Sequence, residues 1–445
     1  MTVILDTTTA SQSTRRWVPL LLDSVAQCPV RRGGALVPHS DVIAATERLT
    51  VTFNTATGFG KAGNFAVGSF GNMINIDIRC VPSDYEEVVN LLHEVLYCAE
   101  ITKERLLVFV QRLLNDVAQV RRNGNKMVYD ILRDSVYCKD SNVHWSTVLR
   151  QQKFLKNILE RLNASDDSAE AVLREAREEL TNVTKHIWLH LATDFERYKL
   201  SAEPWKKFAR DDLMTAPPKL MLDAELMTSE TGGGGYVVGV GGLESAFLAA
   251  LSPGPRGAAL PHAAPLTLAL NYFTQLEGPM WRLIRGCGLS YSYGVRPSFT
   301  EARVVFSLYR ATNVLAAYTK AKSIVDEFLA SGKFDEDLFA SARSTAVFET
   351  VENEKCPADT VRTSLLNYLK QAPDDYTQQL VCALGAVDHA GARAAAAQWL
   401  SQVFTAGRTA VVCHPSKVND LQAAFRKINV ELDAFESMEA THFNA

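Results

Sequence analysis

Alternating apolar and polar positions mark several expected β-strands along this chain. Ile74, Ile76 and Ile78 repeat with a period of two, which is typical of a strand with one face buried. Weaker alternation predicts further strands in the first half of the chain. Together with the strand of these isoleucines, the expected strands of this half cover residues 3–5, 49–56, 65–70, 73–80 and 183–191. These short segments are separated by much longer stretches with another periodicity.

Apolar positions spaced three and four apart predict helices over most of the remaining chain. A long helix is expected after Ser83, which with Glu86 has the spacing of a capping box. His93 would lie on this helix and face solvent. Other helices of the first half are expected over residues 14–25, 41–48, 102–122, 125–137, 146–162 and 168–181.

The second half repeats the order of the first. Strands are expected over 236–251 (two, if the chain bends at Gly241-Gly242), 289–295, 303–309 and 409–413. Helices are expected over 266–284, 313–330, 336–353, 359–370, 374–384, 390–405 and 418–428. Residues from Glu47 correspond to those from Gly288, and residues from Met73 to those from Arg303. In each half, two strands lead to a long helix, a helical bundle and an edge strand, which indicates an internal duplication.

This order predicts the α+β class: two homologous domains, each a mainly antiparallel sheet covered on one face by helices. A length of 445 residues also fits two domains better than one. We expect the first domain over residues 1–201, a linker over 202–235 and the second domain over 236–445. Pro204, Pro217, Pro218 and the run Gly232–Gly235 favour the linker assignment.

Composition narrows the functional classes. The net charge is −4, with 47% hydrophobic and 22% charged residues, so nothing indicates a nucleic-acid partner. No apolar stretch reaches the roughly 18 residues that would span a membrane. The eight cysteines form no CxxC pair and the start of the chain has no secretory signal pattern. We therefore expect a reducing compartment, cytoplasmic or alternatively mitochondrial.

Histidine spacing gives no complete metal motif. His186 and His190 are four apart, but on the expected strand they would stand about 13 Å apart, too far to share one zinc ion. His93-Glu94 begins an HExxH pattern whose last position is Tyr97. The glycine run at 232–235 is not followed by the residues of a phosphate-binding loop. We expect no metal bound by this chain and no catalytic residue in it.

The stretch Leu276–Val295, LEGPMWRLIRGCGLSYSYGV, offers the strongest candidate chemistry. Arg285 lies where a helix should end, and Tyr291 lies six residues later on the following strand. Gly286 and Gly288 allow a tight turn that could direct the guanidinium and the phenol into one concavity. Spacing alone favours a solvated helix-end cation and a tyrosine packed in a sheet.

This stretch resembles a signature of the insulinase-type (pitrilysin-like, M16) zinc metallopeptidases. It is closest to the presequence-protease-like branch, whose pattern is EGPLW-x-x-IRG-x-GLAYG. Met280 replaces leucine, Ser290 replaces alanine, and Tyr293 is a further departure. Segments near Arg15, Val120 and Gly242 also resemble the third and fourth of that family's four homologous domains.

The resemblance implies the C-terminal half of such a peptidase. In that family a zinc-bearing N-terminal half carries HxxEH, and the two halves close into a chamber that degrades peptides. Arg285 and Tyr291 would bind the substrate backbone, and Zn²⁺ would belong to the partner half, in the same or a separate chain. Two alternatives stay open: a structural subunit like those of the processing peptidase and the complex III core, or a pseudoenzyme that binds peptides.

Overall fold

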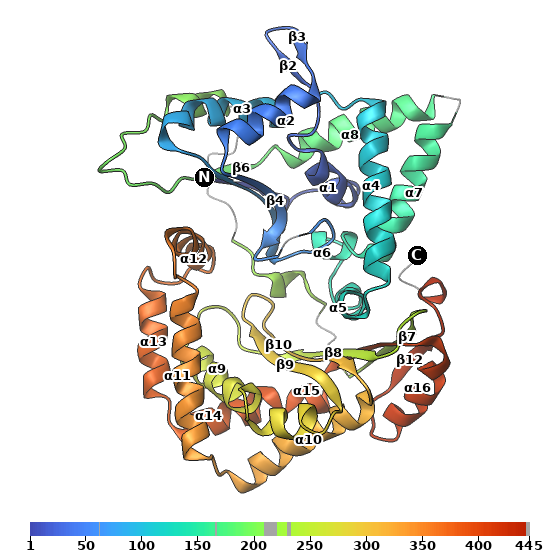
Figure 1. Cartoon of the computed structure of the whole chain (residues 1–445), viewed down its shortest axis with the longest axis vertical. Helices are drawn as coiled ribbons and strands as arrows, with labels where there is room; N and C mark the ends of the chain where they lie inside the picture. Colours follow the sequence, from blue (N-terminus) through green and yellow to red (C-terminus); the bar gives the residue numbers. More distant parts are fainter. Residues whose placement is uncertain (62, 165–166, 209–219, 229–232, 442–445) are drawn as a thin grey trace. The chain divides into compact units, whose positions relative to one another are not determined.

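The computed structural model describes residues 1–61, 63–164, 167–208, 220–228 and 233–441. The chain forms two compact units. Unit 1 consists of Met1–Gln119 and Cys138–Lys219, and unit 2 of Val120–Tyr137 and Leu220–Ala445. Residues 120–137 thus belong to unit 2, although they lie inside the range expected for the first domain (Figure 1).

Unit 1 is built on an antiparallel four-stranded sheet in the order β4-β5-β1-β6. Its strands are β1 (Thr2–Asp6), β4 (Thr52–Phe59), β5 (Ser69–Arg79) and β6 (Ile187–His190). A separate hairpin pairs β2 (Val30–Arg32) with β3 (Ala35–Val37). The helices of this part of the chain are α1 (Gln12–Ser24), α2 (His39–Leu49), α3 (Tyr85–Tyr97), α4 (Lys103–Arg121), α6 (Asn142–Trp145), α7 (Val148–Asn163) and α8 (Ser168–Val183).

Unit 2 contains a six-stranded sheet in the order β12-β7-β11-β8-β10-β9. Its strands are β7 (Gly234–Gly239), β8 (Ala246–Pro253), β9 (Ser290–Ser298), β10 (Arg303–Ala311), β11 (Arg408–Cys413) and β12 (Leu432–Phe435). Its helices are α5 (Gly124–Asp134), α9 (Leu260–Thr274), α10 (Val314–Ser331), α11 (Glu336–Glu352), α12 (Pro357–Leu369), α13 (Tyr376–Ala386), α14 (His389–Ala395), α15 (Gln402–Thr405) and α16 (Val418–Arg426).

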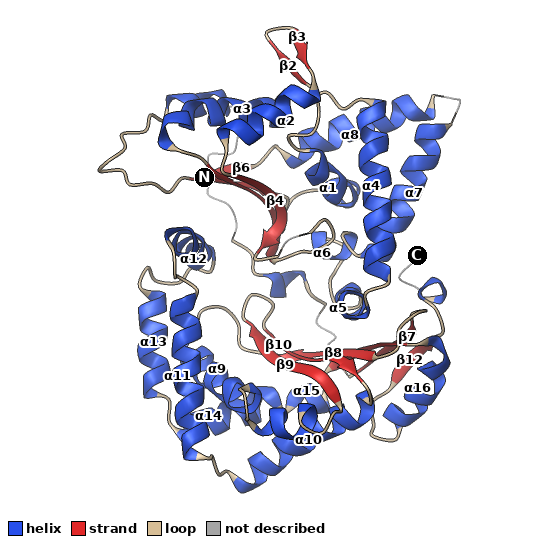
Figure 2. Ribbon diagram, in the orientation of Figure 1, coloured by secondary structure: helices blue, strands red, loops and turns tan. Residues whose placement is uncertain are grey.

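The two sheets share one topology. The order β4-β5-β1-β6 of unit 1 matches β9-β10-β8-β11 of unit 2, with the same antiparallel pairing at each step. The expected correspondence of Glu47 with Gly288 and of Met73 with Arg303 falls on the matching pairs β4/β9 and β5/β10. The α+β class is therefore confirmed, since Figure 2 shows both helices and strands in each unit, and the duplicated order appears in the strand pairing.

Some local predictions were wrong. The helix expected over 266–284 is broken: α9 ends at Thr274, and the left-handed Glu277 and the Gly278-Pro279 pair interrupt it before a π-helical turn, Trp281–Arg285. Residues 65–70 are not a separate strand, because β5 begins only at Ser69. Ser83 does not cap α3, since a short 3₁₀ turn over Pro82–Asp84 leads into that helix.

The ends of unit 2 also differ from expectation. The closing strand β11 is not at an edge: it lies between β8 and β7 and runs parallel to β7. Gly234 and Gly235 begin β7 instead of extending a linker, and a Cβ on Gly235 would stand 1.6 Å from the Thr409 carbonyl oxygen. Gly232, with residues 209–219 and 229–231 of the expected linker, lies outside the described residues.

The central strand β8 of the unit 2 sheet is buried on both faces. Leu248, Ala250 and Phe306 belong to the core that the sheet forms with α9, α10 and other helices of this unit. Phe247 and Leu251 alternate with them on the other face, and both are only 6% exposed. Helix α5 packs on β8 and β11, and Gly124 lies against the Phe247 ring. The fully buried apolar side chains of α5 are Met127, Val128, Ile131 and Leu132.

A buried arginine joins three segments of unit 1. Arg15 on α1 is 1% exposed, and its guanidinium donates to the side-chain oxygens of Asn72 (3.1 Å) and Asn142 (3.0 Å) and to the Thr8 carbonyl (3.1 Å). Burial lowers the pKa of Arg15 from its usual value, while Asp140 opposes that change. Since buried polar groups need partners, these bonds fix α1 to the start of β5 and to α6.

Candidate functional site

The π-helical turn Trp281–Arg285 positions the predicted arginine. The Gly286 amide donates to the Trp281 carbonyl over 2.8 Å, which closes the wide turn. Gly286 is needed here, because a Cβ at this position would stand 2.5 Å from the Arg282 carbonyl oxygen. Ile284 is fully buried in the core of unit 2, and the next side chain, Arg285, is exposed. Single π turns of this kind are frequent at functional sites.

A second glycine leads from this turn into β9. Gly288 has φ +70, a left-handed conformation that favours glycine. The Leu289 amide donates to the Ile284 carbonyl (3.0 Å), and the Thr312 hydroxyl donates to the Gly288 carbonyl (2.7 Å). These bonds fix the geometry between the turn and the first residues of β9.

The structure brings Arg285 and Tyr291 together. The Arg285 guanidinium carbon lies 5.5 Å from the centre of the Tyr291 ring, within the range of a cation–π contact. Tyr291 is 63% exposed. The turn thus presents one guanidinium and one phenol side by side to solvent, as two hydrogen-bond donors that a ligand could reach.

Tyr293 is packed in the structure, whereas Tyr291 is exposed. It packs against the core of unit 2, and its hydroxyl donates to the Thr274 carbonyl of α9 over 3.3 Å. Burial raises the pKa of Tyr293 to about 12, although nearby Arg285 opposes the rise. Tyr293 therefore stays protonated near neutral pH and attaches β9 to α9, so Tyr291 is the phenol left accessible on this part of the strand.

The histidines of unit 1 do not gather into a metal site. His93 is partly exposed and packs against Tyr97 and Phe208, so it faces solvent only in part. Desolvation lowers its pKa, with a contribution from Lys207. His190 ends β6, and desolvation also lowers its pKa. In the described part of the chain, no group of three or more His, Cys, Asp or Glu residues could hold a metal ion.

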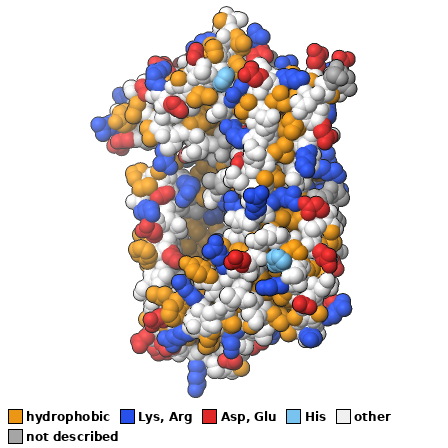
Figure 3. All heavy atoms as spheres, turned by 45° about the vertical axis from the view of Figure 1, so that its right-hand side comes forward, with side chains coloured by type: hydrophobic (Ala, Val, Ile, Leu, Met, Phe, Trp, Pro, Cys, Tyr) orange, Lys and Arg blue, Asp and Glu red, His pale blue; other side chains and the backbone are white. Residues whose placement is uncertain are grey.

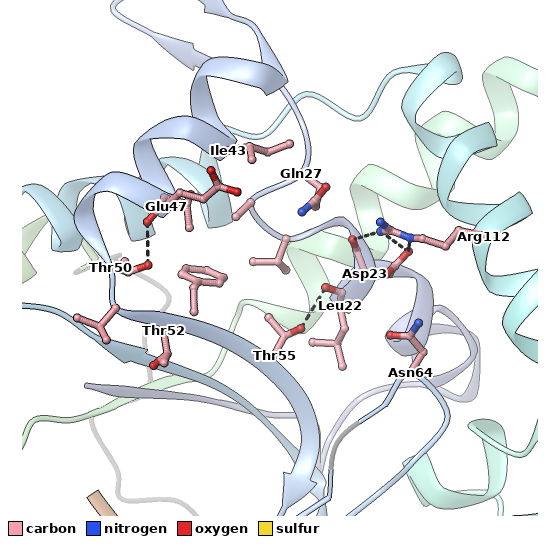
Figure 4. A pocket seen from close by; sticks show the side chains of 15 residues that line it. Leu22, Asp23, Gln27, Ile43, Glu47, Thr50, Thr52, Thr55, Asn64 and Arg112 are labelled. Carbon is pink, nitrogen blue, oxygen red and sulfur yellow. Dashed lines mark hydrogen bonds and ion pairs between the residues drawn. The ribbon is translucent and has the colours of Figure 1, made fainter.

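Unit 1 contains a pocket of about 520 Å³ that the sequence did not indicate (Figure 4). The pocket is surrounded by α2, by β4 and by the C-terminal end of α1. Most of its polar lining consists of threonine and amide side chains. Its arginine, Arg112, is paired with Asp23 at 2.7 Å. Burial is the main cause that raises the pKa of Asp23, against the hydrogen bond from Arg112. The pair neutralises both charges, and nothing in the lining singles out a ligand.

Figure 3 shows one face of the molecule, on which both basic and acidic side chains lie. This mixture agrees with the net charge of −4. Within the described segments, no helix has the length and apolar character needed to cross a membrane.

Comparison with known sequences gives distant relatives. No protein-family profile matches the chain. It is 22% identical over 427 residues to an uncharacterised protein of Caenorhabditis elegans, covering 95% of this chain and 42% of that protein. It is 23% identical over 389 residues to an uncharacterised protein of Saccharomyces cerevisiae, covering 83% and 37%. The chain thus spans less than half the length of these curated relatives.

Solved structures share its architecture. A protease from Helicobacter pylori has a TM-score of 0.61 at 14% identity, over 92% of both chains. A domain of Pseudomonas fluorescens described as a peptidase M16 inactive domain has a TM-score of 0.61 at 14% identity, over 92% of this chain and 91% of that one. The periplasmic protease PqqL of Escherichia coli has a TM-score of 0.56 at 11% identity, over 93% of this chain and 42% of that one. The chain therefore shares the fold of these proteins, one of which is described as a peptidase M16 inactive domain.

Proposed function

We propose that this chain is the non-zinc-binding half of an M16-type metallopeptidase. It would close against a zinc-bearing half, in the same or a separate chain, to form a chamber that degrades peptides. The fold supports this proposal, as does the coverage of only 42% of PqqL by nearly the whole chain. The sequence contains no HxxEH motif, so the zinc ligands would have to come from the other half.

Arg285 and Tyr291 are the proposed substrate-binding residues. The observation that carries this assignment is their contact at 5.5 Å on an exposed turn whose geometry requires Gly286. Zinc held by the other half would supply a nucleophilic water, and hydrolysis of a peptide bond develops negative charge on the carbonyl oxygen. A phenol and a guanidinium held together can donate hydrogen bonds to that oxygen or to the neighbouring backbone.

The exposure of the pair fits a site completed by closure. Such donors stabilise charge most strongly where water is excluded. Tyr291 is 63% exposed in this chain, so a second surface would have to cover it. The chain alone is therefore proposed to bind peptides weakly and not to cleave them.

Two preparations test the proposal: the full chain purified alone, and the complex isolated from its source cells through a tag on this chain. We expect the chain alone to leave a quenched-fluorescence peptide intact, with or without added Zn²⁺. The complex should cleave it in a reaction that a chelator abolishes. In the complex, Arg285→Ala should lower kcat/KM by roughly a hundredfold, as expected for loss of one oxyanion donor.

Arg282→Ala is the matched control, because Arg282 is exposed on the same turn and has no ring contact with Tyr291 in the described structure. It should leave kcat/KM within about twofold of the unmodified complex. Cleavage by the chain alone would overturn the proposal. An isolated complex that is a large membrane assembly would instead favour a structural subunit, and retained peptide binding without any cleavage would favour a pseudoenzyme.

A further inference from the structure

A second arginine–tyrosine pair lies beside the first. The guanidinium carbon of Arg310 stands 5.4 Å from the centre of the Tyr309 ring, nearly the separation found between Arg285 and Tyr291. Tyr309 and Arg310 are on β10, which pairs directly with the β9 strand that carries Tyr291. Arg310 is exposed and Tyr309 is partly exposed.

A β-bulge makes this second pair possible. Successive side chains of a regular strand point to opposite faces of the sheet, so neighbours such as Tyr309 and Arg310 would not normally meet. The register between β10 and β8 shifts between Leu308 and Ala311, and Arg310 has φ +51. Bulges reorient side chains next to functional sites, and a positive φ at a non-glycine residue is strained.

The two pairs form one continuous surface. The rings of Tyr291 and Tyr309 lie 6.2 Å apart in an edge-to-face contact. The Tyr309 ring also contacts Phe247, which is 6% exposed, at 5.5 Å. Buried Phe247 thus supports Tyr309, Tyr309 contacts Tyr291, and a guanidinium lies near each tyrosine ring.

Neither guanidinium forms an ion pair or a side-chain hydrogen bond with another described residue. An arginine stacked on an aromatic ring keeps the N–H groups at its edge available, and their planar fork matches a carboxylate. An arginine held at a bulge without a carboxylate partner therefore suits recognition of an anionic group on a ligand.

We propose that Arg310, supported by Tyr309, is a specificity-determining residue that binds a carboxylate of the peptide held by Arg285 and Tyr291. This inference rests on the proposed function and deepens it by naming the substrate class: peptides with a carboxylate near the bound backbone. The carboxylate could be an aspartate or glutamate side chain or the free C-terminus. Both present the same group to the guanidinium.

Binding of labelled decapeptides to the full chain, followed by fluorescence anisotropy at low salt, tests this inference. One peptide carries a single central glutamate and an amidated C-terminus. A second has glutamine instead, and a third has glutamine with a free C-terminus. We expect the glutamate or the free-terminus peptide to bind roughly three- to tenfold more tightly than the neutral peptide, the range for an exposed charge-assisted contact. Whichever of them gains affinity identifies the source of the carboxylate.

Arg310→Asn should abolish the difference in affinity between the charged and the neutral peptides. Asparagine tolerates positive φ, so the bulge should keep its backbone conformation. Arg310→Glu should reverse the preference towards a peptide carrying lysine, which a merely structural role would not do. Arg296→Ala is the control: Arg296 is exposed on the same sheet, but its guanidinium donates to the Tyr129 hydroxyl. It should leave the preference intact. Circular dichroism melts verify that each variant is folded.

The outcomes separate the two proposals. Equal affinities for the charged and neutral peptides, or a preference that survives Arg310→Glu, would overturn the role of Arg310 and leave Arg285 and Tyr291 as backbone-binding residues. If no peptide binds the full chain and the isolated complex cleaves none, both proposals fail. Arg285→Ala should weaken binding of all the peptides, in contrast to the selective effect at Arg310.

Discussion

A chain reduced to residues 220–445 is expected not to reach its native fold, because it lacks α5. The face of the unit 2 sheet that carries Phe247 and Leu251 would then lie open to water. Burying each of the four apolar side chains of α5 contributes roughly 1.5–3 kcal/mol, or roughly 6–12 kcal/mol together. That is comparable with the whole stability of a domain, about 5–15 kcal/mol.

The measurement is recovery of soluble, cooperatively melting protein. Fusing residues 120–137 to the fragment through a flexible linker should restore both properties. In the full chain, Ile131→Asp should disrupt unit 2, since Ile131 is 1% exposed. Lys126→Ala on the exposed side of the same helix should have little effect. A stable, monomeric 220–445 fragment would show that α5 is not needed.

Replacing Arg15 by methionine should destabilise unit 1 by roughly 3–5 kcal/mol. Methionine occupies much of the same volume but removes three hydrogen bonds, and it leaves the Thr8 carbonyl and the Asn142 amide oxygen without this donor. A loss of this size corresponds to a fall of roughly 10 °C in the melting temperature of a domain of about 200 residues.

Arg16→Met serves as the control, because Arg16 is adjacent but exposed, with its guanidinium over the Trp145 ring at 4.2 Å. Its loss should cost less than about 1 kcal/mol. Urea unfolding monitored by tryptophan fluorescence compares the two variants. Equal free energies of unfolding for the two variants would mean that the cost of desolvating Arg15 offsets its hydrogen bonds.

The elements with a strong local pattern were predictable from sequence. The period of two at Ile74, Ile76 and Ile78 indicates β5, and the correspondence of the two halves indicates the duplicated sheets. The break in the helix expected over 266–284 carried a signal that was overlooked, since Gly278-Pro279 is a turn pair. The pairing of Arg285 with Tyr291 followed from the two glycines between them, and the contact is present.

Other features depend on partners distant in sequence. The apolar face of α5 indicates that the helix is buried but not on which surface, so its place on the sheet of unit 2 could not be predicted. The bulge at Arg310 arises from the register of β10 against β8, and the sequence of β10 alone does not show it. The expected domain ranges, the substrate contacts and the zinc-bearing partner stay predictions.

The strand order of unit 2 has a consequence for synthesis on the ribosome. β7 is the first strand of unit 2 to be synthesised, but it pairs with β11 and β12 and not with the next strand, β8. At 5–20 residues per second, the about 170 residues between β7 and β11 take roughly 10–30 s to translate. Throughout that interval β7 has two unpaired edges, which is the state in which nascent strands aggregate. The yield of the chain should therefore depend on chaperones that shield this strand until its distant partners emerge.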